Sequence, residues 1–286
     1  MLKPSLNWHD FEVIASGGGE KIERWGDIIL SRPDPQCIWE LKNSNIEIHG
    51  RYRRSDTGGG FWEWQKPVPA EWQIGYKDMK FIISPMNFKH TGLFPEQAVN
   101  WDKIQSVILT RKQSVPKVLN LFAYTGAATV AAASAGAKVT HVDASRGMTD
   151  VAKRNVELNG LNARYIVDDV SKFVEREIRR GNLYDAIILD PPNFGRGASG
   201  EIWKLESDLN KLILNCIKLL SANPLFILLN NYTASVFLPS IQNIFIKGLR
   251  ESQLKYKIEY YDIGLPTSEG LILPCGGSVF VSFIPK

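Results

Sequence analysis

The sequence predicts an α/β fold: a doubly wound sheet of seven mostly parallel strands with one antiparallel C-terminal strand, plus a small N-terminal β-rich domain. Three observations predict it. From about Val115 onward, strand and helix patterns alternate strictly. Several of the strand patterns end in an acidic residue, and residues 1–90 mix Trp, Gly and Pro without a helical period. Strict alternation of this kind is typical of a parallel sheet covered by helices on both faces.

The alternating part begins with a short apolar run and continues through glycine-terminated helix patterns. Gly136, Gly160 and Gly181 supply the helix stops, because glycine readily adopts the left-handed conformation that ends a helix. The expected strands are 118–122, 138–142, 165–167, 186–189 and 225–229, and the expected helices are 127–135, 146–159, 171–180 and 205–220.

Both ends of the chain depart from this rhythm. Residues 253–263 and 278–284 resemble strands joined by a long Gly/Pro-rich loop; because no helix fits between them, at least one is expected to run antiparallel. At the other end, close alternation of Trp, Gly and Pro predicts short strands and tight turns. We therefore expect a β-rich domain over 1–90, suited to substrate recognition, and a second domain over 91–286 whose first segment is 91–115.

Composition restricts the possible environments and partners. A formal net charge of +4 is compatible with a polyanionic partner without requiring one. The N-terminus does not resemble a signal peptide, and no apolar run is long enough for a membrane span. The three cysteines form no CxxC pair and the four histidines are scattered, so neither a disulfide framework nor a metal site is predicted. We expect a cytoplasmic protein.

The stretch VLNLFAYTGAATVAAASAGAKVTHVDAS predicts a nucleoside-binding βαβ unit. Its loop carries only Gly126, whereas a pyrophosphate needs close backbone approach at several glycines, so NAD and FAD are disfavoured. Asp143 ends the second strand, where a carboxylate can accept hydrogen bonds from ribose hydroxyls. A nucleoside cofactor without phosphates fits better, and S-adenosylmethionine is the common one.

Two further acids extend this prediction. Asp169 ends the third strand and Asp190 the fourth, and ligands of open α/β sheets lie at the carboxyl ends of the strands. Such residues can also simply cap the helices that follow them. Three of them at successive strand ends favour a ligand-binding rim.

Four segments together resemble class I S-adenosylmethionine-dependent methyltransferases, and within them the bacterial ribosomal RNA large-subunit methyltransferase group. They are LNLFAYTGAATVAAASAGAKVTHVDAS, NVELNGL, ILDPPNFGRG and GLFPEQAVNW, and the resemblance covers the chain from about Phe88 to its end. It implies a Rossmann-like fold, and it implies a role for each matching residue. In this resemblance a loop after the first strand wraps the methionine part of the cofactor, and Asp190 lies near the methionine amine. Asp143 holds the ribose, and Asp169 binds the amino group of the adenine. Two further residues lie beside the adenine, and two residues of the segment before the first strand close the pocket. The loop residues are Phe122, Ala123, Tyr124, Thr125 and Gly126. The residues beside the adenine are Ala144 and Ser145, and those that close the pocket are Gln97 and Asn100.

The turn after the fourth strand resembles the D/N-P-P-Y/F motif of enzymes that methylate amino groups of bases. Its candidate catalytic residues are Asp190, Pro191, Pro192, Asn193 and Phe194. Because proline fixes φ and lacks an N–H, such a turn presents acceptors in a set direction. Asn193 stands where those enzymes have the aromatic residue, which weakens the assignment of a base amino group as the target.

Cysteine placement separates the possible targets. Methylation of cytosine C5 needs a cysteine nucleophile, and the expected place after the fifth strand holds Asn230 and Asn231. Cys216 lies on an apolar helix stripe and is expected in the core, whereas Cys275 lies in the late loop, where it is either an incidental thiol or close to the site. Nitrogen methylation is therefore favoured over C5.

Basic residues are compatible with an RNA substrate. Arg51, Arg53 and Arg54 precede Trp62 and Trp64, and phosphate contacts beside stacking aromatics are a nucleic-acid pattern, although a charged strand beside a Trp-rich core looks similar. Arg196, in a Gly-Arg-Gly tail, is a further candidate substrate contact.

The sequence thus predicts an S-adenosylmethionine-dependent methyltransferase acting on a base in RNA, most simply ribosomal RNA. Two alternatives stay open: methylation of a protein or small molecule on the same fold, and a non-catalytic RNA-binding or assembly protein.

Overall fold

The computed structural model describes the chain except for residues 43–44, 56–58, 87, 197–199, 201 and 286. The chain divides into two compact units. The N-terminal unit contains residues 2–99 and 263–275, and the C-terminal unit contains residues 100–262 and 276–286. No pattern in the sequence indicates that 263–275 belongs with the N-terminal part.

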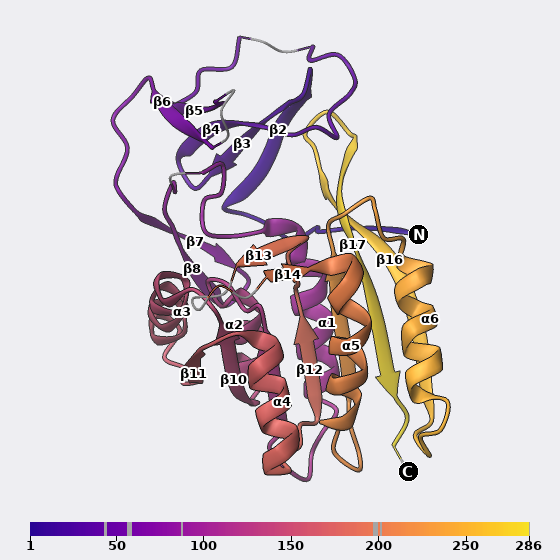
Figure 1. The fold of residues 1–286 in the computed structure, drawn as a ribbon. Coiled ribbons are helices and arrows are strands. Elements are labelled where there is room, and N and C mark those ends of the chain that lie inside the picture. The colour runs from indigo at the N-terminus through magenta and orange to yellow at the C-terminus, as the bar shows by residue number, and fades with distance from the viewer. Residues whose placement is uncertain (43–44, 56–58, 87, 197–199, 201, 286) are drawn as a thin grey trace. The chain divides into compact units, whose positions relative to one another are not determined.

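A mostly parallel sheet forms the centre of the C-terminal unit (Figure 1). Its strands follow the order β16-β17-β15-β12-β9-β10-β11. The five strands from β15 to β11 pair in parallel, and β17 runs antiparallel to β15. The predicted fold class is therefore confirmed. The strands are β9 (Lys117–Leu121), β10 (Lys138–Asp143), β11 (Arg164–Val167), β12 (Ala186–Leu189), β15 (Phe226–Asn231), β16 (Tyr256–Pro266) and β17 (Ile272–Phe283). The edge strand β1 (Leu2–Pro4), which the sequence did not predict, pairs with β16.

Helices cover both faces of this sheet, with α4 and α5 in front of it and α1 and α2 behind it in Figure 1. The four predicted helices are present to within two residues at either end. Two helices were not predicted: α1, which follows the leading segment, and α6, which follows β15. The helices are α1 (Ala98–Ile108), α2 (Ala127–Ser134), α3 (Arg146–Leu158), α4 (Val170–Arg180), α5 (Leu205–Lys218) and α6 (Leu238–Leu249). None of the helices in the described chain is long and apolar enough to cross a bilayer.

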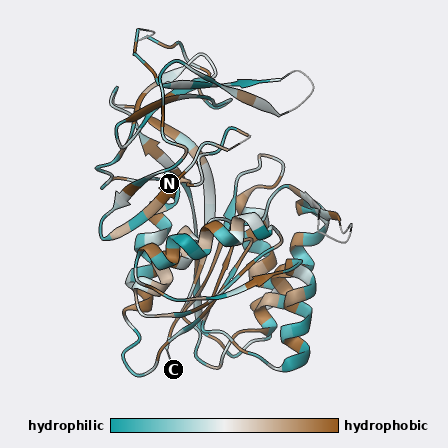
Figure 2. Ribbon diagram, turned by 90° about the vertical axis from the view of Figure 1, so that its left-hand side faces the viewer, coloured by the Kyte–Doolittle hydropathy of each residue, from teal (hydrophilic) through white to brown (hydrophobic). Residues whose placement is uncertain are grey.

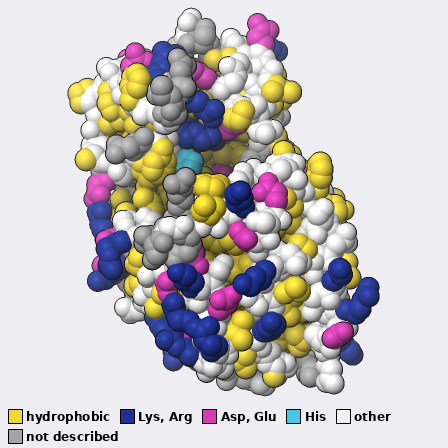
Figure 3. Space-filling model, viewed as in Figure 1, with side chains coloured by type: hydrophobic (Ala, Val, Ile, Leu, Met, Phe, Trp, Pro, Cys, Tyr) yellow, Lys and Arg dark blue, Asp and Glu magenta, His cyan; other side chains and the backbone are white. Residues whose placement is uncertain are grey.

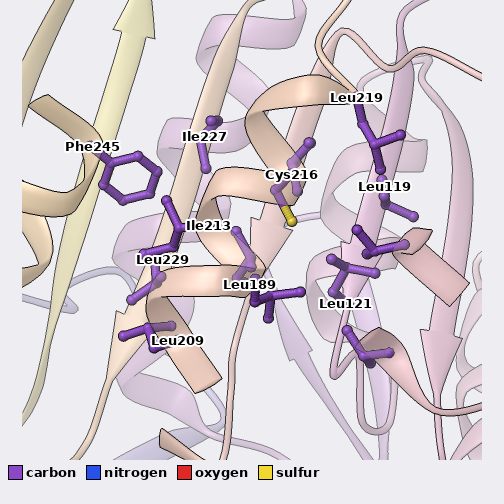
Figure 4. Close-up of a cluster of buried hydrophobic side chains, with 14 of the residues drawn as sticks. Leu119, Leu121, Leu189, Leu209, Ile213, Cys216, Leu219, Ile227, Leu229 and Phe245 are labelled. Atoms are coloured by element: carbon purple, nitrogen blue, oxygen red, sulfur yellow. The ribbon is translucent and has the colours of Figure 1, made fainter. Parts of the chain in front are cut away.

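The main core lies between the sheet and α4, α5 and α6. Figure 4 shows Leu209, Ile213 and Cys216 of α5 among side chains of the central strands and Phe245 of α6, all of them buried. The prediction that Cys216 is a core residue is confirmed. Figure 2 shows the matching pattern, with hydrophobic residues along the central strands and hydrophilic ones on the outward helix surfaces.

The C-terminal hairpin differs from its prediction. The residues expected to form a long loop are largely strand, and the connection is closed by a hydrogen bond from the Thr267 amide to the Leu271 carbonyl at 2.9 Å. Gly264 and Gly277, which resemble loop residues in sequence, lie in these strands. A Cβ at Gly264 would lie 2.7 Å from the Leu273 carbonyl oxygen, and one at Gly277 would lie 2.6 Å from Leu238. These glycines therefore permit close approach of neighbouring chain segments.

The N-terminal unit is built from short strands and tight turns, as predicted. Its five-stranded sheet has the order β2-β3-β4-β5-β6, and β7 and β8 form a separate hairpin. The elements are β2 (Phe11–Gly17), β3 (Glu20–Trp25), β4 (Ile28–Pro33), β5 (Gly50–Arg54), β6 (Gly60–Trp64), β7 (Trp72–Tyr76), β8 (Met79–Ile83) and the 3-10 turn η1 (Pro95–Gln97).

A buried ion pair joins β3 to β4 in this unit. Arg32 donates two hydrogen bonds to the Glu23 carboxylate, at 2.6 and 2.8 Å, and Lys21 lies 3.2 Å from it. Burial alone would raise the pKa of Glu23, but the charges of Arg32 and Lys21 outweigh burial and lower it to about 2. The carboxylate stays ionised inside the unit because both cations are in contact with it.

Candidate active site

The loop between β9 and α2 has a strained backbone. Phe122 and Tyr124 adopt φ values of 54° and 50°, and Gly126 adopts 84°. Non-glycine residues rarely adopt this left-handed region, and where they do the surrounding structure must hold them there. Here the Ala123 amide donates to the Val142 carbonyl of β10 at 3.1 Å, and the Gly126 amide donates to the Ala123 carbonyl at 3.0 Å.

Asp143, the last residue of β10, holds this loop. One oxygen of its carboxylate accepts from the Tyr124 amide and the other from the Ser145 amide, both at 2.8 Å. Burial raises the pKa of Asp143, and the two hydrogen bonds from backbone amides act to lower it. Each carboxylate oxygen can accept a second hydrogen bond, so the side chain suits a ligand with two neighbouring hydroxyl groups.

Helix α3 supports the same loop from behind. The buried Asn155 donates its side-chain amide to the Thr125 carbonyl at 2.8 Å. Gly126 faces Ala152, where an added Cβ would lie 2.9 Å from the alanine methyl group. Our sequence reasoning gave Asn155 no role, although it begins the NVELNGL segment. The start of α2 has no side-chain cap, so its first amides can meet a carboxylate.

One strand-end acid, Asp169, and the nearby Ser145 act as helix caps. Asp169 accepts from the Lys172 amide at 2.9 Å and caps α4, and Ser145 accepts from the Met148 amide at 3.3 Å and caps α3. Both still lie on the predicted rim, because Asp143 pairs with Val167 in the parallel register of β10 and β11. The neighbouring Ala144 is exposed. Capping uses one Asp169 oxygen, and its predicted contact with a base amino group stays a prediction.

The Asp190–Phe194 turn leads from β12 into a small hairpin of β13 (Phe194–Arg196) and β14 (Ile202–Lys204). The Trp203 indole N–H donates to the Pro192 carbonyl at 2.7 Å, and the Leu205 amide donates to the Asn193 carbonyl at 3.0 Å. The Pro192 and Asn193 carbonyls therefore both accept hydrogen bonds from within the protein. Trp203 also packs against Phe122, with ring centroids 5.2 Å apart, and so links the turn to the loop. No sequence motif marks Trp203.

Several side chains of this turn are exposed. Asn193 is exposed, and 52% of the Phe194 surface is accessible. Phe194 is thus presented to solvent at the carboxyl end of the sheet, one residue later than in the motif that the turn resembles. Arg196 lies in β13, and Gly197 of the predicted basic tail lies outside the described residues.

Two asparagines that end β15 have different surroundings. Leu189 pairs with Leu229, so Asp190, directly after β12, comes next to Asn230 of the neighbouring parallel strand β15. The Asn230 side-chain oxygen accepts from Asn100 at 3.1 Å and from Ser278 at 3.0 Å. Asn231 instead donates to the Thr233 and Val236 carbonyls, at 3.1 and 2.7 Å, and holds the next loop.

The leading segment contributes to this network. Asn100 receives a hydrogen bond from the Tyr261 hydroxyl at 2.7 Å while donating to Asn230 and Ser278, and all four side chains lie in the C-terminal unit. Gln97 is buried at the end of η1 in the N-terminal unit. The structure gives Asn100 a supporting contact to Asn230, and its predicted closure of the cofactor pocket, like that of Gln97, stays a prediction.

Comparison with known proteins identifies the family of this chain. The family model for S-adenosylmethionine-dependent methyltransferases matches residues 37–234. The chain belongs to this family. Its cofactor is accordingly S-adenosylmethionine, and the Phe122–Gly126 loop, the Asp143 carboxylate and the uncapped start of α2 fit the nucleoside and carboxylate of that molecule.

Individual relatives support this membership. This chain is 30% identical over 222 residues to the ribosomal RNA large subunit methyltransferase K of Neisseria meningitidis serogroup B. The match covers 72% of this chain and 61% of that protein. A SAM-dependent methyltransferase from Agrobacterium tumefaciens has 33% identity and a TM-score of 0.90, with 100% of this chain and 94% of the other covered. A protein solved in complex with SAH shares the fold at 21% identity and a TM-score of 0.76, covering 97% and 76% of the two chains. The chain thus spans about three fifths of the curated relative.

The three cysteines of this methyltransferase are poor nucleophiles. Cys37 and Cys216 are fully buried, and burial raises the pKa of both thiols, that of Cys37 to about 12. Cys275 belongs to the N-terminal unit and donates to the Leu273 carbonyl at 3.4 Å; burial, and next the charge of Glu96, raise the pKa of its thiol well above the usual value. Because the thiolate is the reactive form, burial disfavours the reactive form of all three cysteines.

Proposed function

We propose that this protein transfers the methyl group of S-adenosylmethionine to a nitrogen atom of a base in ribosomal RNA. The observation that carries the choice of nitrogen is the identity of the residues at the carboxyl end of β15. There the chain has Asn230, whose side chain is held by Asn100 and Ser278, and its three cysteines lie elsewhere, at 37, 216 and 275. Burial raises the pKa of all three thiols. Methylation at cytosine C5 needs a thiolate that attacks the ring first. The kinship to a ribosomal RNA large subunit methyltransferase supports the substrate class.

The reaction needs positioning more than covalent help from the protein. The bound cofactor supplies an electrophilic methyl group on a positively charged sulfur. The lone pair of the base nitrogen forms the new N–C bond as the C–S bond breaks, and an exocyclic amine then releases one proton to water. Holding the two reactants in line can supply roughly 7–11 kcal/mol of the barrier reduction. The Pro191-Pro192 turn and the Trp203 contact provide a rigid wall for this purpose.

Asn230 is the candidate group that orients the base. Its oxygen already accepts two hydrogen bonds, which fixes the amide orientation and leaves the NH₂ group as the donor for a ligand. A base that presents a carbonyl or a ring-nitrogen acceptor meets this requirement. Phe194, half exposed beside the same strand ends, offers a surface on which the base can stack.

The test is methyl transfer from tritiated S-adenosylmethionine to unmodified large-subunit ribosomal RNA, with a protein extract as the competing acceptor. Nucleosides from the digested RNA are identified by mass spectrometry. We expect label in an N-methylated nucleoside, loss of transfer in Asn230→Ala, and unchanged transfer in Cys275→Ser. Recovery of 5-methylcytidine, or label confined to protein, would contradict the proposal.

A further inference from the structure

The pleat of the N-terminal sheet sorts the basic residues of β5 onto opposite faces. Strands β5 and β6 are antiparallel, with Tyr52 opposite Trp62 and Gly50 opposite Trp64. Because alternate residues of a strand point to opposite faces, four side chains share one face, which we call the tryptophan face. They are Tyr52, Arg54, Trp62 and Trp64.

The opposite face is electrically balanced. Arg53 lies 3.0 Å from Glu63 across the β5–β6 pair, and Arg51 lies 3.7 Å from Glu20. Phe61 shares this face and is 61% exposed. Two of the three arginines that the sequence offered as RNA contacts are therefore paired with acids on the side away from the tryptophans.

The rings of the tryptophan face are preorganised. Trp62 and Trp64 stack with centroids 5.2 Å apart and an interplanar angle of 14°, and Tyr52 meets Trp62 edge-on at 5.5 Å. Trp64 lies over Gly50, where a Cβ would come within 2.4 Å of its ring. The Trp62 indole N–H donates to the Met86 carbonyl at 2.9 Å, while Trp64, at the open end of the stack, is 41% exposed. Such a fixed ring provides a stacking surface at low entropic cost.

Positive charge lies on the same face. Leu30 pairs with Gly50, so Arg32 of β4 continues this face, and its guanidinium donates to the Lys89 carbonyl at 3.0 Å. Arg54 is exposed at the end of β5. Burial lowers the pKa of Lys89; Asp34 opposes this, while the charges of Lys21, Arg32 and Arg54 lower it further. Figure 3 shows Lys and Arg side chains beside hydrophobic ones over the strands of this unit.

The face that carries the exposed Trp64 ring therefore also carries positive charge, with Arg54 at the other end of β5. Glu23 is paired with Arg32 and Lys21, and Asp34 lies 3.3 Å from Lys21, so both acids contact cations other than Arg54 and Lys89. An anion placed near Lys89 would lower the electrostatic energy of the cluster. A chain that alternates phosphates with flat bases matches both features, because stacking needs unpaired bases and the cations need phosphate.

We propose that the tryptophan face binds a single-stranded segment of the RNA substrate, with a base stacked on Trp64 and phosphates at Arg54 and Lys89. This inference rests on the proposed function for the identity of the substrate. It assigns the N-terminal unit the task of holding RNA, and it removes Arg51 and Arg53 from the set of contacts.

The chain supplies its own matched controls for the test. Arg54→Gln and Arg53→Gln remove the same charge from adjacent residues on opposite faces, and Trp64→Ala and Phe61→Ala each remove one exposed ring. Binding of a fluorescein-labelled single-stranded oligouridine RNA of about 12 nucleotides is measured by anisotropy across a salt series. We expect Trp64→Ala to weaken binding by about 5- to 150-fold. Arg54→Gln should lower the slope of log K against log salt by about 0.7, the value of one phosphate contact on a single strand.

The controls decide the result. Arg53→Gln and Phe61→Ala should bind as the wild type does, with thermal melting used to confirm that all four variants fold. Equal losses in both members of either pair, losses in neither, or no RNA binding by the wild type would overturn the proposal. Asp143→Ala separates it from the methyl-transfer claim, because that variant should lose SAH binding and keep RNA binding. Methylation of RNA with intact binding in Trp64→Ala and Arg54→Gln would leave the function standing and refute this surface.

Discussion

Replacing Gly126 by alanine tests whether the cofactor loop is held by its close contact with α3. Two costs add at this position. The φ of 84° lies in the left-handed region, which costs an alanine about 1–2 kcal/mol, and the new methyl group would lie 2.9 Å from the Cβ of Ala152 and 3.2 Å from its Cα. Overpacking of this kind costs about 1–3 kcal/mol more. We therefore expect Gly126→Ala to lower the free energy of unfolding by about 2–5 kcal/mol.

Gly136 is the matched control, because its φ is 91° and an added Cβ would meet nothing within 4 Å. Gly136→Ala should therefore show the backbone cost alone, about 1–2 kcal/mol. Urea denaturation measures both values, and calorimetric titration with SAH should show about tenfold weaker binding in Gly126→Ala only. Adding Ala152→Gly should recover part of the SAH affinity. Equal stability losses in the two variants, with SAH binding intact in both, would refute the close-contact explanation.

Three further predictions concern the buried polar groups. His141 is fully buried, and burial lowers its pKa to about 4. Protonation of this histidine in the unfolded chain should therefore remove about 3 kcal/mol of stability as the pH falls from 6.5 to 4. Urea titrations should find a smaller loss in His141→Gln. Glu23→Ala leaves Arg32 buried without its carboxylate partner and should lower the free energy of unfolding by about 3–5 kcal/mol in the same assay. Glu63→Ala removes an exposed ion pair and should lower it by at most about 1 kcal/mol. Similar losses in the two variants would contradict the account. Asn155→Ala removes the donor to the Thr125 carbonyl, so it should lower the free energy of unfolding by about 1–3 kcal/mol and weaken SAH binding. Normal SAH affinity in a folded variant would show that this contact does not position the loop.

The sequence predicted the parallel sheet well because local signals agree there. Apolar runs such as 186–189, glycine stops such as Gly181, and acids at strand ends each fix one boundary, and they alternate without conflict. The C-terminal hairpin was predicted less well, because Gly264 and Gly277 signal a loop by composition. Their actual role, to admit Leu273 and Leu238 at close range, depends on neighbours that only the folded chain brings together.

Prediction of the site reached the residues inside motifs and missed their partners. Asp143 and Gly126 were found from one βαβ unit. The support of Asn230 by Asn100 joins residues 130 positions apart, and the contact from Trp203 to Pro192 depends on a hairpin without a motif. The arginines of β5 show a related limit, since a shift of one residue in register would exchange the faces of Arg53 and Arg54.

The most direct test of cofactor binding at Asp143 is calorimetric titration of the protein with SAH, comparing the wild type with Asp143→Ala and Asp150→Ala. Asp143 accepts hydrogen bonds from the backbone amides of Tyr124 in the loop and of Ser145 at the start of α3, whereas Asp150 is an exposed residue of α3. The account predicts one SAH bound per wild-type chain, unchanged binding in Asp150→Ala, and a loss of at least about tenfold in affinity in Asp143→Ala. Absence of binding by the wild type, or equal affinity in all three proteins, would contradict it.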